Sequence, residues 1–445
     1  MESNIFNSDP DLVIEARWVI PVRPGGVVME HAAVIVHNGR IEAILPVSEA
    51  RQRCNAKETI RLPEHALLPG LINAHTHAAM TLMRGLADDR PLMDWLGNHI
   101  WPAEGQVLSE RFVRDGTLLA CAEMLKGGVT TFNDMYFFPE AAAEAVNLSG
   151  MRAALGLVVL DFPSPYAADA DDYLNKGFAA RDALRGHLRI TTCLAPHAPY
   201  TVNDRIFNKV LTYADQLGAN IHLHLHETHH EIEQGEAQYG MRPMRRLTEL
   251  GLMGPNVLAA HCVHMTPIEI ETLALQGAHV AHCPGSNLKL GSGIAPVADM
   301  LAAGINVALG SDGAASNNRL DMFAEMRLAA LLAKASGDAE VLPAMQVLEM
   351  ATINGARALG MDDNIGSLEH GKLADMIAVD FSAIEMQPCY DPISHLVYVA
   401  GREHVSHAWV AGELCYERGI HAHIDPAELK EIATLWQGRL KPFHQ

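Results

Sequence analysis

The chain has 445 residues, of which 49% are hydrophobic and 19% are charged. A chain of this length and composition can bury a large core, which excludes intrinsic disorder as its default state. It carries 33 Lys and Arg against 53 Asp and Glu, a formal net charge of −20. Such a surface repels nucleic acid and anionic membranes, so we expect neither as a partner.

Seven cysteines are spread along the chain without a CxxC pair: Cys54, Cys121, Cys193, Cys262, Cys283, Cys389 and Cys415. An odd number of scattered cysteines is typical of reduced, mostly buried thiols in a cytosolic protein. The first residues, MESNIFNSDPDL, show neither the basic nor the apolar segment of a signal peptide. No uncharged stretch reaches the roughly 18 residues of a membrane span. We therefore expect a cytoplasmic location.

Short β-like runs alternate with longer helical patterns over the centre of the chain. The eight runs cover residues 71–75, 129–134, 153–161, 189–195, 220–226, 257–261, 279–283 and 306–312. Alternating strands and helices favour parallel strands, and eight such units over about 240 residues favour a closed barrel. We therefore predict an α/β fold with a (β/α)8 TIM-type barrel, and an open doubly wound sheet is the alternative.

Several helical patterns stop at a glycine just before the next run. These glycines are Gly127, Gly128, Gly150, Gly218, Gly251, Gly277 and Gly304. Glycine adopts the left-handed conformation that ends a helix, so these positions are predicted boundaries between helices and the strands that follow.

The two ends of the chain differ from its centre. Residues 12–46 contain alternating runs and the pair Asn38-Gly39, a strong signal for a tight hairpin turn. Residues 374–380 and 407–419 also resemble strands, and residues 425–437 a helix. Neither β segment can form a stable sheet alone.

The predicted domain organisation follows from this contrast. We expect residues 1–68 and 366–445 to build one small β-sandwich domain, which includes the terminal helix. Residues 69–365 would form the barrel.

The first run ends in two histidines separated by one residue, His75 and His77. Residues i and i+2 of a strand face the same side, so both point inward at the C-terminal mouth of a barrel, where barrel enzymes place their sites. Two buried imidazoles there are costly without a metal or hydrogen-bond partners. A single HxH is weak evidence by itself, because chance or a satisfied histidine pair explains most of them.

The fifth run contains residues 222–227, which read HLHLHE and place three histidines on one face. We interpret His224 as the metal ligand, because Glu227 can then still reach a substrate. His222 lies deeper and is expected to be a packed structural histidine. The role of His226 is left open.

Two further runs end in polar residues at the same barrel end. The sixth ends at His261, and the eighth places Asp312 directly before a glycine. An aspartate at a strand mouth can act as a ligand or a base, and a helix N-cap is the alternative. Because four runs carry such residues at corresponding ends, the combination indicates a metal-dependent active site.

A competing motif lies in residues 226–230, which match HExxH, the zinc protease signature. That signature needs His226 and His230 on one helix, with Glu249 as a conceivable third ligand. Here His226 closes a strand-like alternation instead, and the protease hypothesis leaves the other histidines unexplained. A further zinc-enzyme signature, H-x-E followed by P-C-x-x-C, is absent. The Pro-Cys pair at 388–389 has no second cysteine three residues later.

A set of longer segments resembles a known family: PGLINAHTH, HLHLHET, AAHCVH, HCPGSNLKLG, GSDGAASNN, NGARALG and GSLEHGKLADMIAVD. Over residues 11–420 the chain resembles the amidohydrolase superfamily, and more narrowly the 5′-methylthioadenosine/S-adenosylhomocysteine deaminases. These segments are highly specific for the superfamily and moderately specific for the substrate.

The resemblance implies a set of metal ligands and catalytic residues. The ligands would be His75, His77, His224 and Asp312. Glu227 and His261 would handle protons together with Asp312.

The resemblance also implies residues that bind the substrate. Glu104, in WPAE, would meet the ribose hydroxyls, and His197, in APHAPY, would contact the nucleoside. Glu227 and Asp312 would face the purine base, and Trp95 would line the same pocket, with core packing as the alternative for this tryptophan. No arginine could be assigned to the carboxylate of S-adenosylhomocysteine.

The reaction implied by this resemblance is hydrolytic deamination of a small-molecule purine nucleoside. One Zn²⁺ per subunit is expected, and Fe²⁺ or Mn²⁺ also suits the ligand set. A homo-oligomer is expected. The alternatives in the same superfamily are a guanine or other aminopurine deaminase and a chlorotriazine hydrolase. A catalytically silent barrel is a remoter alternative, whose mark would be a missing ligand, and none is missing.

Overall fold

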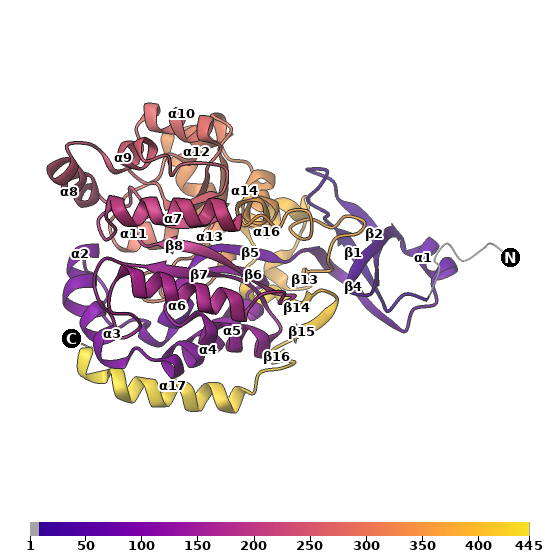
Figure 1. The fold of residues 1–445 in the computed structure, drawn as a ribbon. Helices are drawn as coiled ribbons and strands as arrows, with labels where there is room; N and C mark the ends of the chain where they lie inside the picture. Colours follow the sequence, from indigo (N-terminus) through magenta and orange to yellow (C-terminus); the bar gives the residue numbers. More distant parts are fainter. Residues whose placement is uncertain (1–8, 445) are drawn as a thin grey trace.

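The computed structural model describes residues 9–444, and eight parallel strands form its central sheet. They follow one another in chain order as β5 (Leu71–Thr76), β6 (Val129–Tyr136), β7 (Arg152–Val159), β8 (Ile190–Pro196), β9 (Ile221–Leu225), β10 (Val257–His261), β11 (His279–His282) and β12 (Asn306–Leu309). All eight predicted runs are strands, and helices surround them (Figure 1). The predicted barrel is confirmed.

The barrel closes between its first and last strands, at a seam held by a few specific hydrogen bonds. The Asp312 N–H donates to the His75 carbonyl at 2.9 Å, just beyond the end of β12. The Ser311 N–H donates to Asn73 Oδ1 at 2.8 Å, and Asn73 Nδ2 donates to Ser311 Oγ at 2.6 Å. A Cβ on Gly310 would lie 2.8 Å from the Cβ of His75, so this close approach requires glycine. The seam thus brings together two predicted metal ligands.

The helices of the barrel lie between and after these strands. They are α4 (Glu110–Lys126), α5 (Pro139–Ser149), α6 (Ala170–Ala183), α7 (Asp204–Leu217), α8 (His229–Tyr239), α9 (Pro243–Glu249), α10 (Pro267–Gln276), α11 (Pro284–Lys289), α12 (Val297–Ala302), α13 (Met322–Ala333), α14 (Ala344–Met350) and α15 (Ile353–Ala358). Helix α5 ends at the left-handed Gly150, as expected. Gly127 differs from the expectation, with φ −89°, because the left-handed turn after α4 falls on Gly128 at φ 79°.

A long connection between β5 and α4 folds over the C-terminal mouth of the barrel. It contains a 3₁₀ segment (Ala78–Met83), α2 (Leu92–Asp94), a π-helical turn (Trp95–Ile100) and α3 (Trp101–Val107). Turns of π-helix are rare and often lie at functional sites. This one displays several aromatic and apolar side chains toward the pocket described below.

Both ends of the chain join one mixed sheet in the order β16-β15-β14-β13-β4-β1-β2-β3. Its strands are β1 (Leu12–Val19), β2 (Met29–His37), β3 (Arg40–Pro46), β4 (Glu58–Pro69), β13 (Met376–Asp380), β14 (Val405–Val410), β15 (Glu413–Glu417) and β16 (Ile420–His421). The predicted hairpin is present, with Asn38 and Gly39 at φ 49° and 73°. The small β domain from both termini is confirmed, while its boundaries at 68/69 and 365/366 stay a prediction.

Three further helices lie in the terminal segments of the chain. They are α1 (Val47–Arg53), α16 (Pro392–Tyr398) and the terminal α17 (Pro426–Leu440), which lies along the barrel next to α3 and α4 (Figure 1). The expected helix over residues 425–437 is therefore present. Among the helices of residues 9–444, none is both long and apolar enough to cross a membrane.

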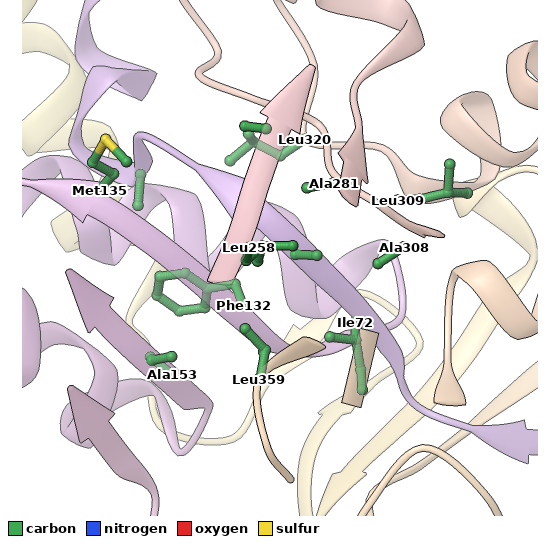
Figure 2. Close-up of a cluster of buried hydrophobic side chains, with 14 of the residues drawn as sticks. Ile72, Phe132, Met135, Ala153, Leu258, Ala281, Ala308, Leu309, Leu320 and Leu359 are labelled. Carbon is green, nitrogen blue, oxygen red and sulfur yellow. The ribbon is translucent and has the colours of Figure 1, made fainter. Parts of the chain in front are cut away.

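The main hydrophobic core fills the barrel and the layer between its strands and helices. Figure 2 shows side chains from several strands gathered in it, among them Ile72, Phe132, Leu258 and Ala308. A buried ion pair joins the barrel to the terminal sheet, since Arg152 Nε on β7 donates to Asp375 Oδ2 at 2.9 Å. This ion pair links the first residue of β7 to the residue just before β13.

Candidate active site

The four predicted metal ligands converge at the mouth of the barrel. His75 lies on β5, His77 follows this strand, His224 lies on β9, and Asp312 follows β12. Asp312 Oδ1 lies 3.3 Å from His75 Nε2 and 3.2 Å from His77 Nε2. His224 Nε2 lies 3.3 Å from His77 Nε2. The four side chains thus meet in one cluster.

The backbone of neighbouring strands fixes the orientation of two of these imidazoles. His77 Nδ1 lies 2.6 Å from the Met135 carbonyl on β6, and His224 Nδ1 lies 2.7 Å from the His197 carbonyl after β8. A carbonyl only accepts hydrogen bonds, so each Nδ1 carries a hydrogen and each Nε2 is the ring atom that faces the cluster. The two Nε2 atoms face each other, an arrangement that a proton or a metal ion between them would stabilise.

Asp312 presents one oxygen to this cluster and has the other tied down. Its Oδ2 accepts hydrogen bonds from Ser286 Oγ at 2.6 Å and Ser316 Oγ at 2.9 Å. Its Oδ1 accepts the Gly313 N–H at 2.7 Å and faces the histidines. The backbone of Asp312 is left-handed, with φ 62°, which turns the side chain into the barrel mouth.

Burial sets the protonation of the cluster. It lowers the pKa of His75 to about 4 and that of His224 well below its ordinary value, so both are neutral near pH 7. Burial alone would raise the pKa of Asp312, but contacts with His75 and His77 hold it well below its usual range. Burial alone would lower the pKa of His77, yet Asp312 raises it to about 9.

These residues fit a divalent metal ion. They combine a buried carboxylate, neutral imidazoles and a His75 Nε2 that is buried without a hydrogen bond. Donor atoms of His75, His77 and Asp312 form one compact group, and those of His75, His224 and His261 form a second. His261 could therefore also reach a metal held here. Nitrogen and carboxylate donors of this kind suit zinc and other first-row metals.

His261 and Glu227 form a pair beside the cluster. His261 Nε2 lies 3.7 Å from Glu227 Oε2, and both side chains are buried. His261 Nδ1 lies 2.9 Å from Asn287 Oδ1, which fixes the ring with Nε2 toward Glu227. Burial raises the pKa of Glu227 and so favours the protonated form of its carboxyl group.

The predicted substrate-binding residues line the pocket that opens onto the cluster. Trp95, Glu104 and His197 all belong to its wall, together with Glu227 and Asp312. Within the described part of the chain, no Lys or Arg lines this pocket. Its remaining wall is largely aromatic and aliphatic, which suits a planar ring and an apolar substituent.

Glu104 and His197 have defined partners in this wall. Tyr136 Oη donates to Glu104 Oε1 at 2.5 Å. Burial raises the pKa of Glu104 to about 7, although the Tyr136 hydrogen bond lowers it in part. His197 Nδ1 lies 2.9 Å from Thr201 Oγ1, and burial lowers the pKa of His197 to about 3. His197 is therefore a neutral imidazole in the wall.

The sequence analysis missed several residues of the site. Tyr136, Trp101 and Tyr200 line the pocket but carry no motif, and aromatic residues in strands and helices are typical of a core. Ser286 lies in the quoted segment HCPGSNLKLG, which was a signal that could have been used. His222, expected to be structural, lies with its Nε2 2.9 Å from His75 Nδ1 and so supports a ligand.

The structure does not support the zinc protease alternative. Helix α8 begins at His229 and is capped by Thr228, so His226 lies outside the helix that carries His230. His226 Nε2 instead accepts the Met244 N–H at 3.1 Å. The two histidines of the HExxH match therefore do not share a helix face.

Comparison with known proteins places the chain in a family. Residues 66–415 match the sequence profile of the amidohydrolase family. This match covers most of the chain, and the chain belongs to the amidohydrolase family.

Individual relatives extend this likeness over nearly the whole chain. A 5-methylthioadenosine/S-adenosylhomocysteine deaminase of Teredinibacter turnerae is 48% identical over 434 residues, covering 97% of this chain and 98% of the relative. A 5′-deoxyadenosine deaminase of Methanosarcina mazei is 44% identical over 407 residues, covering 91% and 92%. A crystal structure of an adenosine deaminase from Xanthomonas campestris with bound zinc has 48% identity and a TM-score of 0.96, covering 98% and 99%.

The ligand geometry predicts about one tightly bound divalent metal per chain, measurable by elemental analysis of purified protein. His75→Ala and Asp312→Asn should both lose it, because each removes one donor of a four-donor shell. His230→Ala is the matched control and should keep the metal. The opposite pattern, with the site emptied by His230→Ala and filled in His75→Ala, would show that the HExxH residues are the ligands.

Proposed function

We propose that this chain is a zinc-dependent hydrolytic deaminase of adenine nucleosides, which converts compounds such as 5′-methylthioadenosine and S-adenosylhomocysteine to the inosine analogues. The observation that carries this proposal is the Glu227–His261 pair beside the metal cluster, in one pocket with Glu104. A proton donor, a metal site and a carboxylate for ribose are the groups that this reaction needs. The named relatives support it.

The metal would be held by His75, His77, His224 and Asp312. When bound, it supplies Lewis-acid activation of the water that is consumed in the reaction. We favour zinc because hydrolysis requires no redox change and because the similar Xanthomonas campestris structure contains bound zinc.

Glu227 and His261 would then act on the purine ring. Glu227, whose protonated form is favoured by burial, donates its proton to ring N1, which makes C6 more electrophilic. His261 holds the attacking water through Nε2 and stabilises the charge that develops on its oxygen. Asp312 accepts the first proton of that water.

The protons and bonds balance over one turnover. A C6–O bond forms, and the proton on Asp312 passes to the amino group. The C6–N bond then breaks and releases ammonia. The remaining hydroxyl proton returns to Glu227, while the proton that was donated stays on N1. The product is the 6-oxo nucleoside, and the side chains regain their starting states.

The ribose end of the pocket distinguishes this proposal from its alternatives. An ionised Glu104, already paired with Tyr136, can accept hydrogen bonds from both ribose hydroxyls. Neither free guanine nor a chlorotriazine has ribose hydroxyls to offer. Deamination of an adenine nucleoside uses the metal site, the proton donor Glu227 and the ribose-binding Glu104, and we therefore prefer this substrate class.

Replacing Glu227 by glutamine tests the proton donor. Glu227→Gln keeps the shape of the side chain and removes its transferable proton, so we expect a loss of kcat of about a hundredfold to ten-thousandfold. Metal content, measured in the same preparation, should remain near the wild-type value. Wild-type turnover in this variant would assign Glu227 a structural role.

The substrate preference follows from the charge of the pocket wall. With Glu104 present and no Lys or Arg in the described wall, a neutral thioether at C5′ should be preferred and a 5′-phosphate repelled. We expect kcat/KM to be highest for 5′-methylthioadenosine, lower for S-adenosylhomocysteine and poor for AMP, adenine and guanine. Ammonia release with each compound measures this.

The variant Glu104→Ala provides the internal comparison. It should lose activity on nucleosides and little on free adenine, because only nucleosides have ribose hydroxyls. If AMP or guanine leads the ranking, or if Glu104→Ala treats adenosine and adenine alike without loss on the nucleoside, the nucleoside assignment is wrong.

The raised pKa of Glu104 predicts a pH dependence of nucleoside binding. A carboxyl group with a pKa of about 7 is mostly protonated at pH 6 and mostly ionised at pH 8. Only the ionised form accepts both ribose hydroxyls, so binding should strengthen as pH rises. The inhibition constant of the product nucleoside should be about tenfold weaker at pH 6 than at pH 8.

Two comparisons isolate Glu104 in this measurement. Hypoxanthine lacks ribose but faces the same base-binding groups, so its inhibition constant should change much less over this range. Glu104→Gln should flatten the profile of the nucleoside. Parallel changes for nucleoside and hypoxanthine would place the titrating group elsewhere.

A further inference from the structure

The position of Glu227 depends on the backbone turn that carries it. Within the described residues, the Glu227 carboxyl group makes no hydrogen bond, and the nearest ion-pair partner is His261 Nε2 at 3.7 Å. The preceding residue, His226, has a left-handed φ of 52°, a conformation that is uncommon for residues other than glycine. The side chain is therefore aimed by its main chain, which must itself be held.

One buried glutamate side chain holds this turn. Glu231 Oε1 accepts the His226 N–H at 2.8 Å, and Glu231 Oε2 accepts the Glu227 N–H at 2.9 Å. The Glu231 side chain is buried, so water does not compete for these bonds. Its two oxygens accept hydrogen bonds from two successive main-chain N–H groups, and this fixes the direction in which the Glu227 side chain points.

The other hydrogen bonds of the turn involve His226 and not the Glu227 N–H. The His226 carbonyl accepts the N–H groups of Val263 and His264, each at 3.0 Å, and its ring accepts the Met244 N–H. Among residues 9–444, Glu231 is the only acceptor of the Glu227 N–H.

A second helix start in the chain shows that this use of the glutamate is unusual. Thr266 and Glu269 open α10 as a regular capping box, in which Glu269 Oε2 accepts the N–H of its own N-cap residue at 2.9 Å. Thr228 and Glu231 have the same spacing at the start of α8, and Thr228 Oγ1 accepts the Glu231 N–H. Glu231, however, reaches past Thr228 to the two preceding amides.

We infer that Glu231 is a positioning residue for the deamination reaction, which holds the main chain of Glu227 so that its carboxyl group faces the purine ring. The inference rests on the proposed role of Glu227 as proton donor. It goes beyond helix capping because the amides that Glu231 binds belong to the active-site turn and not to the helix.

The test compares Glu231→Gln with Glu269→Gln, a matched control that has the same spacing from a capping threonine and lies 3.8 Å from His226 Nδ1 but binds neither amide of the turn. Glutamine keeps the size but presents an NH₂ donor to one of the two amide donors. We expect Glu231→Gln to lower kcat by about tenfold to a hundredfold, with KM changed by less than about threefold and metal retained. Glu269→Gln should lower thermal stability to a similar degree and keep kcat within about twofold.

The double variant Glu227→Gln/Glu231→Gln separates positioning from general support of the fold. If Glu231 acts through Glu227, adding Glu231→Gln to Glu227→Gln should cost less than about twofold in kcat. Equal losses in both backgrounds, or a Glu231→Gln enzyme no slower than Glu269→Gln, would overturn the inference. If Glu231→Gln does not fold, Glu231→Asp, which keeps both oxygens on a shorter arm, decides by the same comparisons.

Failure of the proposed function would look different. In that case the wild-type enzyme would release no ammonia from adenine nucleosides, whereas wild-type turnover by Glu227→Gln would refute only the role of Glu227 as proton donor. An inactive Glu227→Gln together with a fully active Glu231→Gln would refute only the positioning role.

Discussion

His77 Nε2 and His224 Nε2 face each other at 3.3 Å. Each ring is held by the carbonyl of a residue on or just after a neighbouring strand, Met135 and His197. Because these carbonyls can only accept hydrogen bonds, each ring donates through Nδ1 and its Nε2 is left facing the other ring, where a proton or a metal ion between the two stabilises the arrangement. Neighbouring parallel strands thus orient the metal-binding imidazoles at the barrel mouth in the absence of substrate.

The same strands explain why the fold and the site are hard to separate. Asp312 and His75 are joined through the main-chain hydrogen bond that closes the barrel, and Gly310 allows the close approach. A change that loosens the seam would therefore move a carboxylate away from the histidines it balances. The serines that bind Asp312 Oδ2 add to this constraint, since they leave only Oδ1 to face the cluster.

Much of this arrangement could be predicted from the sequence, because the period of two in HxH and HLH places side chains on one face. The same alternation does not predict where the side chains of His261 and Asp312 point, because their left-handed φ angles of 73° and 62° interrupt the extended backbone. Tyr136 could not be distinguished from a core tyrosine, since its partner Glu104 lies 32 residues earlier in the chain. Contacts of this kind depend on how the long connection after β5 folds over the mouth.

The HExxH match shows that a short motif does not determine the local secondary structure. Residues 226–231 read HETHHE, and a helix through all six would place His226 and His230 on one face. Thr228 prevents this, because its side chain caps the helix and begins it at His229. The strand therefore ends in a turn, and the turn leaves two amides that need an acceptor. Glu231 supplies that acceptor, so the cap that excludes the protease geometry also creates the turn that presents Glu227.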